Sequence, residues 1–152
     1  MDTDSYAKML SKSSFCLCPA GDLATPGQRL YDAIAAGCVP ILIGVDSKSL
    51  PFARQIDYNA FAAFASRSGF QKDPVYAIET VLHRLTPRLA TMRHALVDAR
   101  RQLLYGTLKP SAGPSWEPSN VSAAEATSMG EVATLLLREI ALSVNFGGHG
   151  LG

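Results

Sequence analysis

Apolar and polar positions fall into blocks that predict two short buried strands on either side of a helix. Residues 15–18 form an apolar run that ends before a proline, which cannot continue a ladder. Residues 28–36 repeat apolar side chains at helical spacing, and Gly37 follows them as a typical helix C-cap. Residues 38–43 are continuously apolar, as expected of a strand covered on both faces. The pattern predicts a strand, a loop, a helix and a second strand in succession.

The rest of the chain predicts one more strand and further helices. The third strand is expected at residues 60–65, after one helical turn at 54–58, and a loop at 66–73 closes the sheet region. The other expected helices are residues 5–12, a helix that begins at Pro74, residues 88–104 and residues 124–144. Strands that alternate with helices indicate an α/β fold in which a parallel sheet is flanked by helices.

The length and composition favour one packed domain with appended segments. At 152 residues the chain is long enough for one ordinary domain. We expect a domain at residues 1–105, a flexible Pro/Ser/Gly-rich linker at 106–123, the C-terminal helix at 124–144 and a Gly-rich tail at 145–152. Three strands are few for a complete sheet of this class, so we expect the chain to be the C-terminal part of something larger.

The charge pattern argues against a nucleic-acid partner. A formal net charge of +1 produces no field that would gather nucleic acid or an anionic membrane. Four arginines at positions 88, 93, 100 and 101 are expected to form a solvated helix face. The apolar runs are too short to span a bilayer, and no secretory signal precedes the first helix.

The three cysteines are expected to be buried, unpaired thiols. Cys16 and Cys18 alternate on the first strand and so point to one face, with Leu17 on the other. Cys38 begins the second strand, and no further cysteine or suitably spaced histidine completes a zinc site. A nucleophilic thiol is the alternative, but no basic residue lies near it in sequence.

The loop between the first strand and the helix carries groups that suit a nucleoside diphosphate. Gly21 permits close backbone approach, and Thr25 and Gln28 supply hydrogen-bonding side chains near the helix start. The free N–H groups of a first helical turn favour phosphate. Arg29 adds a guanidinium suited to a diphosphate, and Asp32 is an acceptor for both hydroxyls of a ribose.

Other interpretations of this loop remain open. Arg29 and Asp32 are three residues apart and could pair with each other on the helix surface. Asp22 could be a loop or N-cap residue. The loop has neither the GK[ST] of a Walker sequence nor a GxGxxG fingerprint, so a dinucleotide cofactor is disfavoured.

Several short sequence motifs resemble those in the C-terminal region of the exostosin-like (GT47-type) glycosyltransferases. They are a Ser-Phe-Cys-Leu strand, a Pro-x-Gly loop, an Arg-x-x-Asp-Ala helix start and a Gly-Cys-Val-Pro-Ile strand, at residues 14–17, 19–21, 29–33 and 37–41. Residues 50–52 and 56–58 resemble the same family, and the resemblance covers about residues 6–105.

The resemblance implies the Rossmann-like, donor-binding C-terminal half of a two-domain GT-B enzyme. Such an enzyme is an inverting hexosyl or pentosyl transferase that moves a sugar from a nucleotide diphosphate to a polysaccharide or glycoprotein glycan. On this chain Arg29 would stabilise the leaving group, while Gly21, Thr25, Gln28 and Asp32 would bind the donor. The catalytic base would lie in the N-terminal domain or a partner chain.

The resemblance also implies a Golgi or secretory-pathway membrane location and a role in polysaccharide biosynthesis. No Asp-x-Asp sequence is present, and we expect neither a metal nor a cofactor. The alternative is a non-catalytic truncated remnant or nucleotide-binding module of the same fold. A phosphate-binding α/β protein unrelated to sugars is a third hypothesis.

Overall fold

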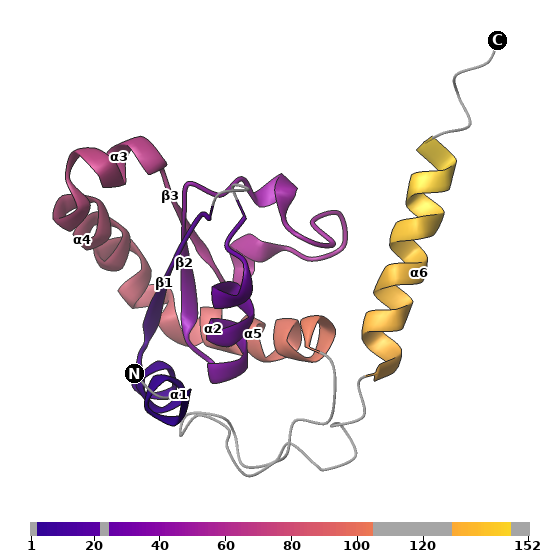
Figure 1. The fold of residues 1–152 in the computed structure, drawn as a ribbon, viewed down its shortest axis with the longest axis horizontal. Helices are drawn as coiled ribbons and strands as arrows, with labels where there is room; N and C mark the ends of the chain where they lie inside the picture. The colour runs from indigo at the N-terminus through magenta and orange to yellow at the C-terminus, as the bar shows by residue number, and fades with distance from the viewer. Residues whose placement is uncertain (1–2, 22–24, 105–128, 147–152) are drawn as a thin grey trace.

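A small parallel sheet lies at the centre of the molecule (Figure 1). The computed structural model describes residues 3–21, 25–104 and 129–146. Within these ranges the three strands stand in the order β1-β2-β3, and both pairings are parallel. The strands are β1 (Phe15–Pro19), β2 (Val39–Ile43) and β3 (Ala63–Ala65). The α/β fold with a parallel sheet is therefore confirmed.

The predicted strand–helix–strand unit is observed at its predicted position. Helix α2 (Gln28–Ala36) connects β1 to β2, and the register pairs Phe15 with Val39. All five residues of β2 are buried. Gly37 adopts a left-handed conformation with φ 71°, and its N–H donates to the Ile34 carbonyl at 3.1 Å. This C-cap satisfies a terminal carbonyl of the helix and turns the chain into β2.

The crossover from β2 to β3 contains short 3₁₀ turns, η1 (Ser47–Ser49) and η2 (Tyr58–Ala60). The third strand is shorter than the predicted residues 60–65 and begins at Ala63. The cause is Asp57, whose carboxylate accepts a hydrogen bond from the Asn59 N–H and so caps η2. Residues 51–55 form turns, so the helical turn expected at 54–58 is not found there.

The predicted loop at residues 66–73 is wrong, because this segment contains α3 (Arg67–Lys72). Ser66 caps the helix by accepting a hydrogen bond from the Gly69 N–H at 3.0 Å. Asp73 then caps the next helix, α4 (Pro74–Leu85), through the Tyr76 N–H at 2.9 Å. Two consecutive side-chain caps therefore stabilise helical structure in a polar segment that lacks an apolar pattern.

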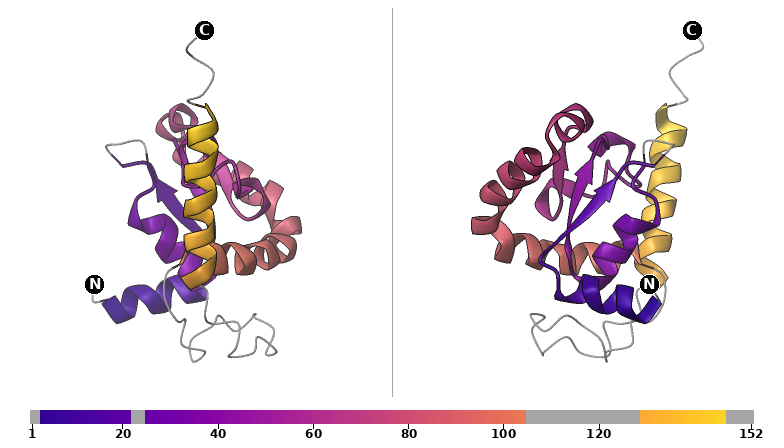
Figure 2. Two further views of the ribbon diagram at one scale, coloured as in Figure 1. Left: turned by 90° about the vertical axis from the view of Figure 1, so that its right-hand side faces the viewer. Right: turned by 60° about the vertical axis from the view of Figure 1, so that its left-hand side comes forward.

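Helices on both sides of the sheet bury its strands. Helix α2 packs against β1 and β2, whereas α4 packs against β3 and α5 (Leu89–Leu103) packs against β2. Figure 2 shows the strands between α2 and α4, and α5 also contacts α2 directly. A further 3₁₀ turn, η3 (Thr86–Arg88), joins α4 to α5, and α1 (Thr3–Lys12) packs against α2. The core includes Leu30, Ile34, Ile41, Leu42, Met92 and Leu96.

The expected solvated arginine face of α5 is only partly correct. Arg88 is exposed, and Arg101 pairs with Asp98 at 3.6 Å. Arg100, however, is only 8% exposed, and the half-buried Arg93 donates to the Ser14 hydroxyl at 3.2 Å. Arginine can bury its aliphatic stem along apolar surface, which a pattern based on charge alone does not detect.

Cys16 and Cys38 form a disulfide, which corrects the expectation of three unpaired thiols. Their Cα atoms are 5.8 Å apart. The β1–β2 register explains the contact, because Phe15 pairs with Val39 and the residues next to this pair are Cys16 and Cys38. Cys18 is the free, buried cysteine, and it shares a strand face with Cys16 while Leu17 is exposed. The predicted alternation along β1 is thus confirmed.

Helix α6 (Met129–Phe146) stands beside the β2–β3 crossover (Figure 1). Glu139 of α6 forms a salt bridge with Arg54 and accepts a hydrogen bond from Gln55 Nε2 at 2.9 Å. Leu135 is buried, and α6 also packs against α5. The expected linker at 106–123 lies outside the described residues, and so does the expected tail at 145–152 except for residues 145 and 146, which belong to α6. Among the described helices, none has the length and apolarity needed to cross a membrane.

Candidate functional site

The loop after β1 closes through backbone hydrogen bonds at the carboxyl edge of the sheet. The Ala20 N–H donates to the Ile43 carbonyl at 2.9 Å, which continues the ladder one residue beyond β1. The Gly21 N–H then donates to the Thr25 carbonyl at 2.8 Å. This backbone hydrogen bond joins two of the predicted donor-binding residues, Gly21 and Thr25. Asp22, which we considered as a cap, lies outside the described residues.

Helix α2 begins with an open N-terminus. Its N-cap residue is Gly27, with φ 55° and ψ −147°, and no side chain among the described residues caps the first turn. The first N–H groups of a helix have no partner within the helix and carry the positive end of its dipole. Gln28 and Arg29, the first two residues of the helix, are both exposed. The first turn thus presents uncapped N–H groups together with an amide and a guanidinium.

Asp32 lies one turn further along α2, where its carboxylate interacts with Tyr6 of α1. Burial raises the pKa of the half-buried Tyr6 phenol above its ordinary value, and the Asp32 charge raises it further, together with a hydrogen bond between the two side chains. The structure contains no ion pair between Arg29 and Asp32, although both side chains are described. The interpretation of these two residues as a surface pair is therefore wrong.

The thiol of Cys18 on β1 contacts the backbone at the start of α2. Its thiol lies 3.6 Å from the Arg29 carbonyl oxygen, to which it donates a weak hydrogen bond. Burial raises the pKa of the Cys18 thiol to about 12, although the positive charge of Arg29 acts in the opposite direction. A thiol with so high a pKa is protonated at neutral pH and is a poor nucleophile. Cys18 therefore supports the site structurally.

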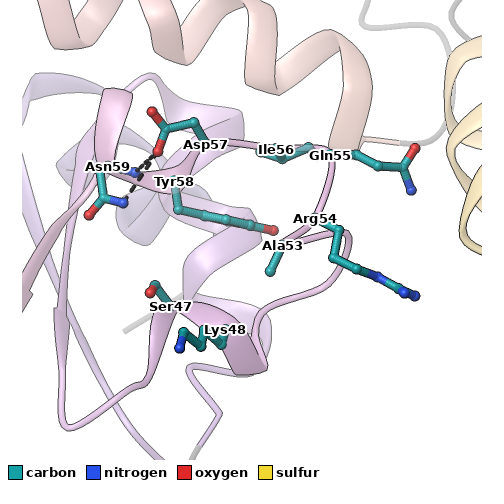
Figure 3. A pocket seen from close by; sticks show the side chains of 9 residues that line it. All are labelled: Ser47, Lys48, Ala53, Arg54, Gln55, Ile56, Asp57, Tyr58 and Asn59. Atoms are coloured by element: carbon teal, nitrogen blue, oxygen red, sulfur yellow. Dashed lines mark hydrogen bonds between the residues drawn. The ribbon is translucent and has the colours of Figure 1, made fainter. Parts of the chain in front are cut away.

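A second polar region, which the sequence did not reveal, lies in the β2–β3 crossover. We call it the crossover hollow, a cavity of about 290 Å³ between the two 3₁₀ turns (Figure 3). Its lining residues are Ser47, Lys48, Ala53, Arg54, Gln55, Ile56, Asp57, Tyr58 and Asn59. The run of Asp57, Tyr58 and Asn59 was a possible signal, but the contribution of Ser47 and Lys48 depends on how the crossover folds back. Within the described ranges, no three His, Cys, Asp or Glu side chains gather as a metal site would require.

Comparison with known proteins decides the family. The domain model described as Exostosin GT47 matches residues 1–81, which is more than half of the chain. The chain belongs to the exostosin GT47 family. The predicted resemblance is thereby confirmed, and the matched residues include β1, α2, β2 and the crossover hollow.

Curated exostosin-family relatives are plant glycosyltransferases. The probable arabinosyltransferase ARAD1 of Arabidopsis thaliana is 31% identical over 110 residues, which cover 72% of this chain and 24% of the relative. The probable beta-1,4-xylosyltransferase IRX10L of Arabidopsis thaliana is 32% identical over 92 residues, covering 60% and 20%. The probable glucuronosyltransferase GUT1 of Oryza sativa subsp. japonica is 29% identical over 92 residues, with the same coverage.

These matches cover about a quarter or less of each relative's length. No solved structure matches the chain. The family membership therefore rests on sequence.

Proposed function

We propose that this chain is the donor-binding portion of an inverting, exostosin-like GT-B glycosyltransferase. The observation that carries the proposal is the open first turn of α2, with exposed Gln28 and Arg29 at the carboxyl edge of a parallel sheet. Ligands of open α/β sheets bind outside the carboxyl ends of the strands. In a chain of a glycosyltransferase family, an anion site at this position suits the diphosphate of a nucleotide sugar.

The proposed roles are those that the family resemblance implies, and the position of the α2 N-terminus at the carboxyl edge of the sheet supports them. Arg29 would stabilise the departing nucleoside diphosphate, because a fixed guanidinium favours the negative charge that develops on the leaving group. Gly21, Thr25 and Gln28 would surround the phosphates. Asp32 would bind the ribose hydroxyls, in exchange for its present interaction with the Tyr6 phenol. In this scheme the guanidinium and the helix N–H groups supply the positive charge, and no metal or cofactor takes part.

The proposal also includes a glycan acceptor and a location in the secretory pathway. A hydroxyl of a polysaccharide or glycoprotein glycan would displace the diphosphate from the sugar. The catalytic base would come from an N-terminal GT-B domain or a partner chain. The Cys16–Cys38 disulfide supports a Golgi or secretory-pathway location, because such bonds persist in oxidising compartments.

A titration of UDP and of GDP into the purified chain, followed by calorimetry, tests the donor site. Arg29→Ala should weaken binding by about 1.5–3 kcal/mol, the range for hydrogen bonds to charged groups. Arg84→Ala on α4 is the matched control, since Arg84 is exposed and lies on a different helix, and it should leave the affinity unchanged. Equal affinities of the wild type and Arg29→Ala for both nucleotides would refute the role of Arg29.

The alternative is a non-catalytic remnant or nucleotide-binding module. Transfer of radiolabelled sugar from a nucleotide sugar to a xylan or arabinan acceptor distinguishes the two. Nucleotide binding without any transfer would favour the module.

A further inference from the structure

The crossover hollow has the size of a site for one ring. Its volume of about 290 Å³ is at the lower end of the range for small-molecule pockets, roughly 300–1,000 Å³. A whole nucleotide sugar would fill considerably more space. The hollow therefore suits a single small polar unit.

The lining of the hollow combines fixed hydrogen-bonding groups with an apolar wall. Asp57 Oδ1 accepts from the Asn59 N–H at 3.0 Å and from Asn59 Nδ2 at 3.3 Å, so the two side chains hold each other in place. The exposed Lys48 forms no ion pair with any residue among those described. Buried Tyr58, whose hydroxyl donates to the Pro51 carbonyl at 2.9 Å, supplies an immobile wall. Donors and acceptors at fixed positions beside an apolar surface are what a polyhydroxylated ring requires.

The shape of the hollow is determined from two sides. Phe52 has φ 56°, a conformation uncommon for a residue other than glycine, and its carbonyl accepts from the N–H groups of Gln55 and Ile56, both at 2.8 Å. Sparsely populated backbone conformations of this kind often occur at ligand-binding sites. On the outer side, Arg54 and Gln55 reach away from the hollow to Glu139 of α6 (Figure 3).

From this geometry we propose that the crossover hollow binds one sugar ring, and that α6 maintains its shape through Glu139. Asn59 and Lys48 would hydrogen-bond ring hydroxyls, and the wall of Tyr58 would exclude water from one face. The choice of a sugar rests on the proposed glycosyltransferase function, while the position, size and polarity of the hollow come from the structure. The ring belongs either to the donor sugar or to the acceptor glycan.

The test follows the backbone amide resonances of residues 47–59 in the full chain by NMR. Xylose, arabinose, glucuronic acid and xylotetraose are titrated separately, and UDP alone is a further probe. We expect at least one saccharide to shift these resonances. Asn59→Ala and Lys48→Ala should each raise its Kd by about fivefold or more, which corresponds to one lost hydrogen bond. The exposed Gln71 and Lys72 of α3 provide the matched controls Gln71→Ala and Lys72→Ala, which should leave the Kd unchanged.

The variants are expected to fold, because Asn59 and Lys48 are both exposed. A preference for the free monosaccharides supports a donor-sugar site, and tighter binding of xylotetraose supports an acceptor site. The proposal is overturned if no saccharide shifts residues 47–59, or if the hollow variants bind as tightly as the controls. UDP binding that depends on Arg29, combined with no saccharide binding, would leave the donor site standing and remove only this inference.

Discussion

The open N-terminus of α2 depends on the backbone of Gly27. The torsions of this residue, φ 55° and ψ −147°, are strongly disfavoured for any residue with a Cβ atom. A Cβ at this position would meet no atom within 4 Å. The requirement for glycine is therefore conformational and does not arise from close packing.

Gly27→Ala should destabilise the fold by about 1–3 kcal/mol, the cost of holding a residue in a sparsely populated backbone region. Urea unfolding followed by circular dichroism measures the change. Gly21→Ala is the matched control, because a Cβ there would make only an ordinary contact of 3.6 Å with the Thr25 carbonyl oxygen. The control should be close to neutral, and equal stability of both variants would contradict the argument.

At the residue scale, the sequence predicted groups that are neighbours along the chain and missed those that are not. Gln28 and Arg29 are exposed at a helix start, as the glycine-rich loop before them indicated. The contact of Asp32 with Tyr6 depends on how α1 packs against α2, which no local pattern encodes. The crossover hollow was missed for the same reason, since Lys48 and Asn59 are separated by a folded-back segment.

At the element scale, the apolar pattern predicted β1, α2 and β2, because β1 and α2 bury one face each and β2 is a continuous apolar run that is buried throughout. Helix α3 was missed, since it is stabilised by the Ser66 cap and has no buried residue of its own. The Cys16–Cys38 disulfide was missed because it depends on strand register, which the two strand segments do not specify separately.

The disulfide should contribute about 3 kcal/mol to the free energy of unfolding, because it closes a loop with a sequence separation of 22. Urea unfolding of the wild type with and without a reductant measures this contribution. The double variant Cys16→Ala/Cys38→Ala should already be destabilised and should not respond to the reductant. A wild type whose stability is the same under both conditions would argue against the bond.

Buried Cys18 should react with a thiol reagent only after unfolding, because its pKa is raised to about 12.

At the scale of the whole molecule, the described surface retains exposed apolar side chains on β1 and on α6. Leu17 on the edge strand β1 is 48% exposed, and Leu137 and Ile140 on α6 are 68% and 58% exposed. Helix α6 is attached on its other side through Leu135 and Glu139. Among the described side chains, this attachment includes the buried Leu135 and a polar contact that depends on the charge of the Glu139 carboxylate.

This polar contact makes the docking of α6 sensitive to pH. Hydrogen bonds from Arg54 and Gln55 lower the pKa of Glu139 below its ordinary value of 4.5. A lowered pKa means that the docked state favours the ionised carboxylate, so the contribution to docking is present above the ordinary pKa and is lost as the pH falls through the lowered value. We expect the amide resonances of residues 135–142 to change on acidification from about pH 7 to about pH 3, while the β1–α2–β2 unit persists.

Glu139→Gln should already show the altered resonances at neutral pH, because the neutral amide attracts Arg54 less strongly. Glu79→Gln on the exposed face of α4 is the matched control and should behave as the wild type. An acid transition of α6 that is unchanged in Glu139→Gln would show that another group controls the docking.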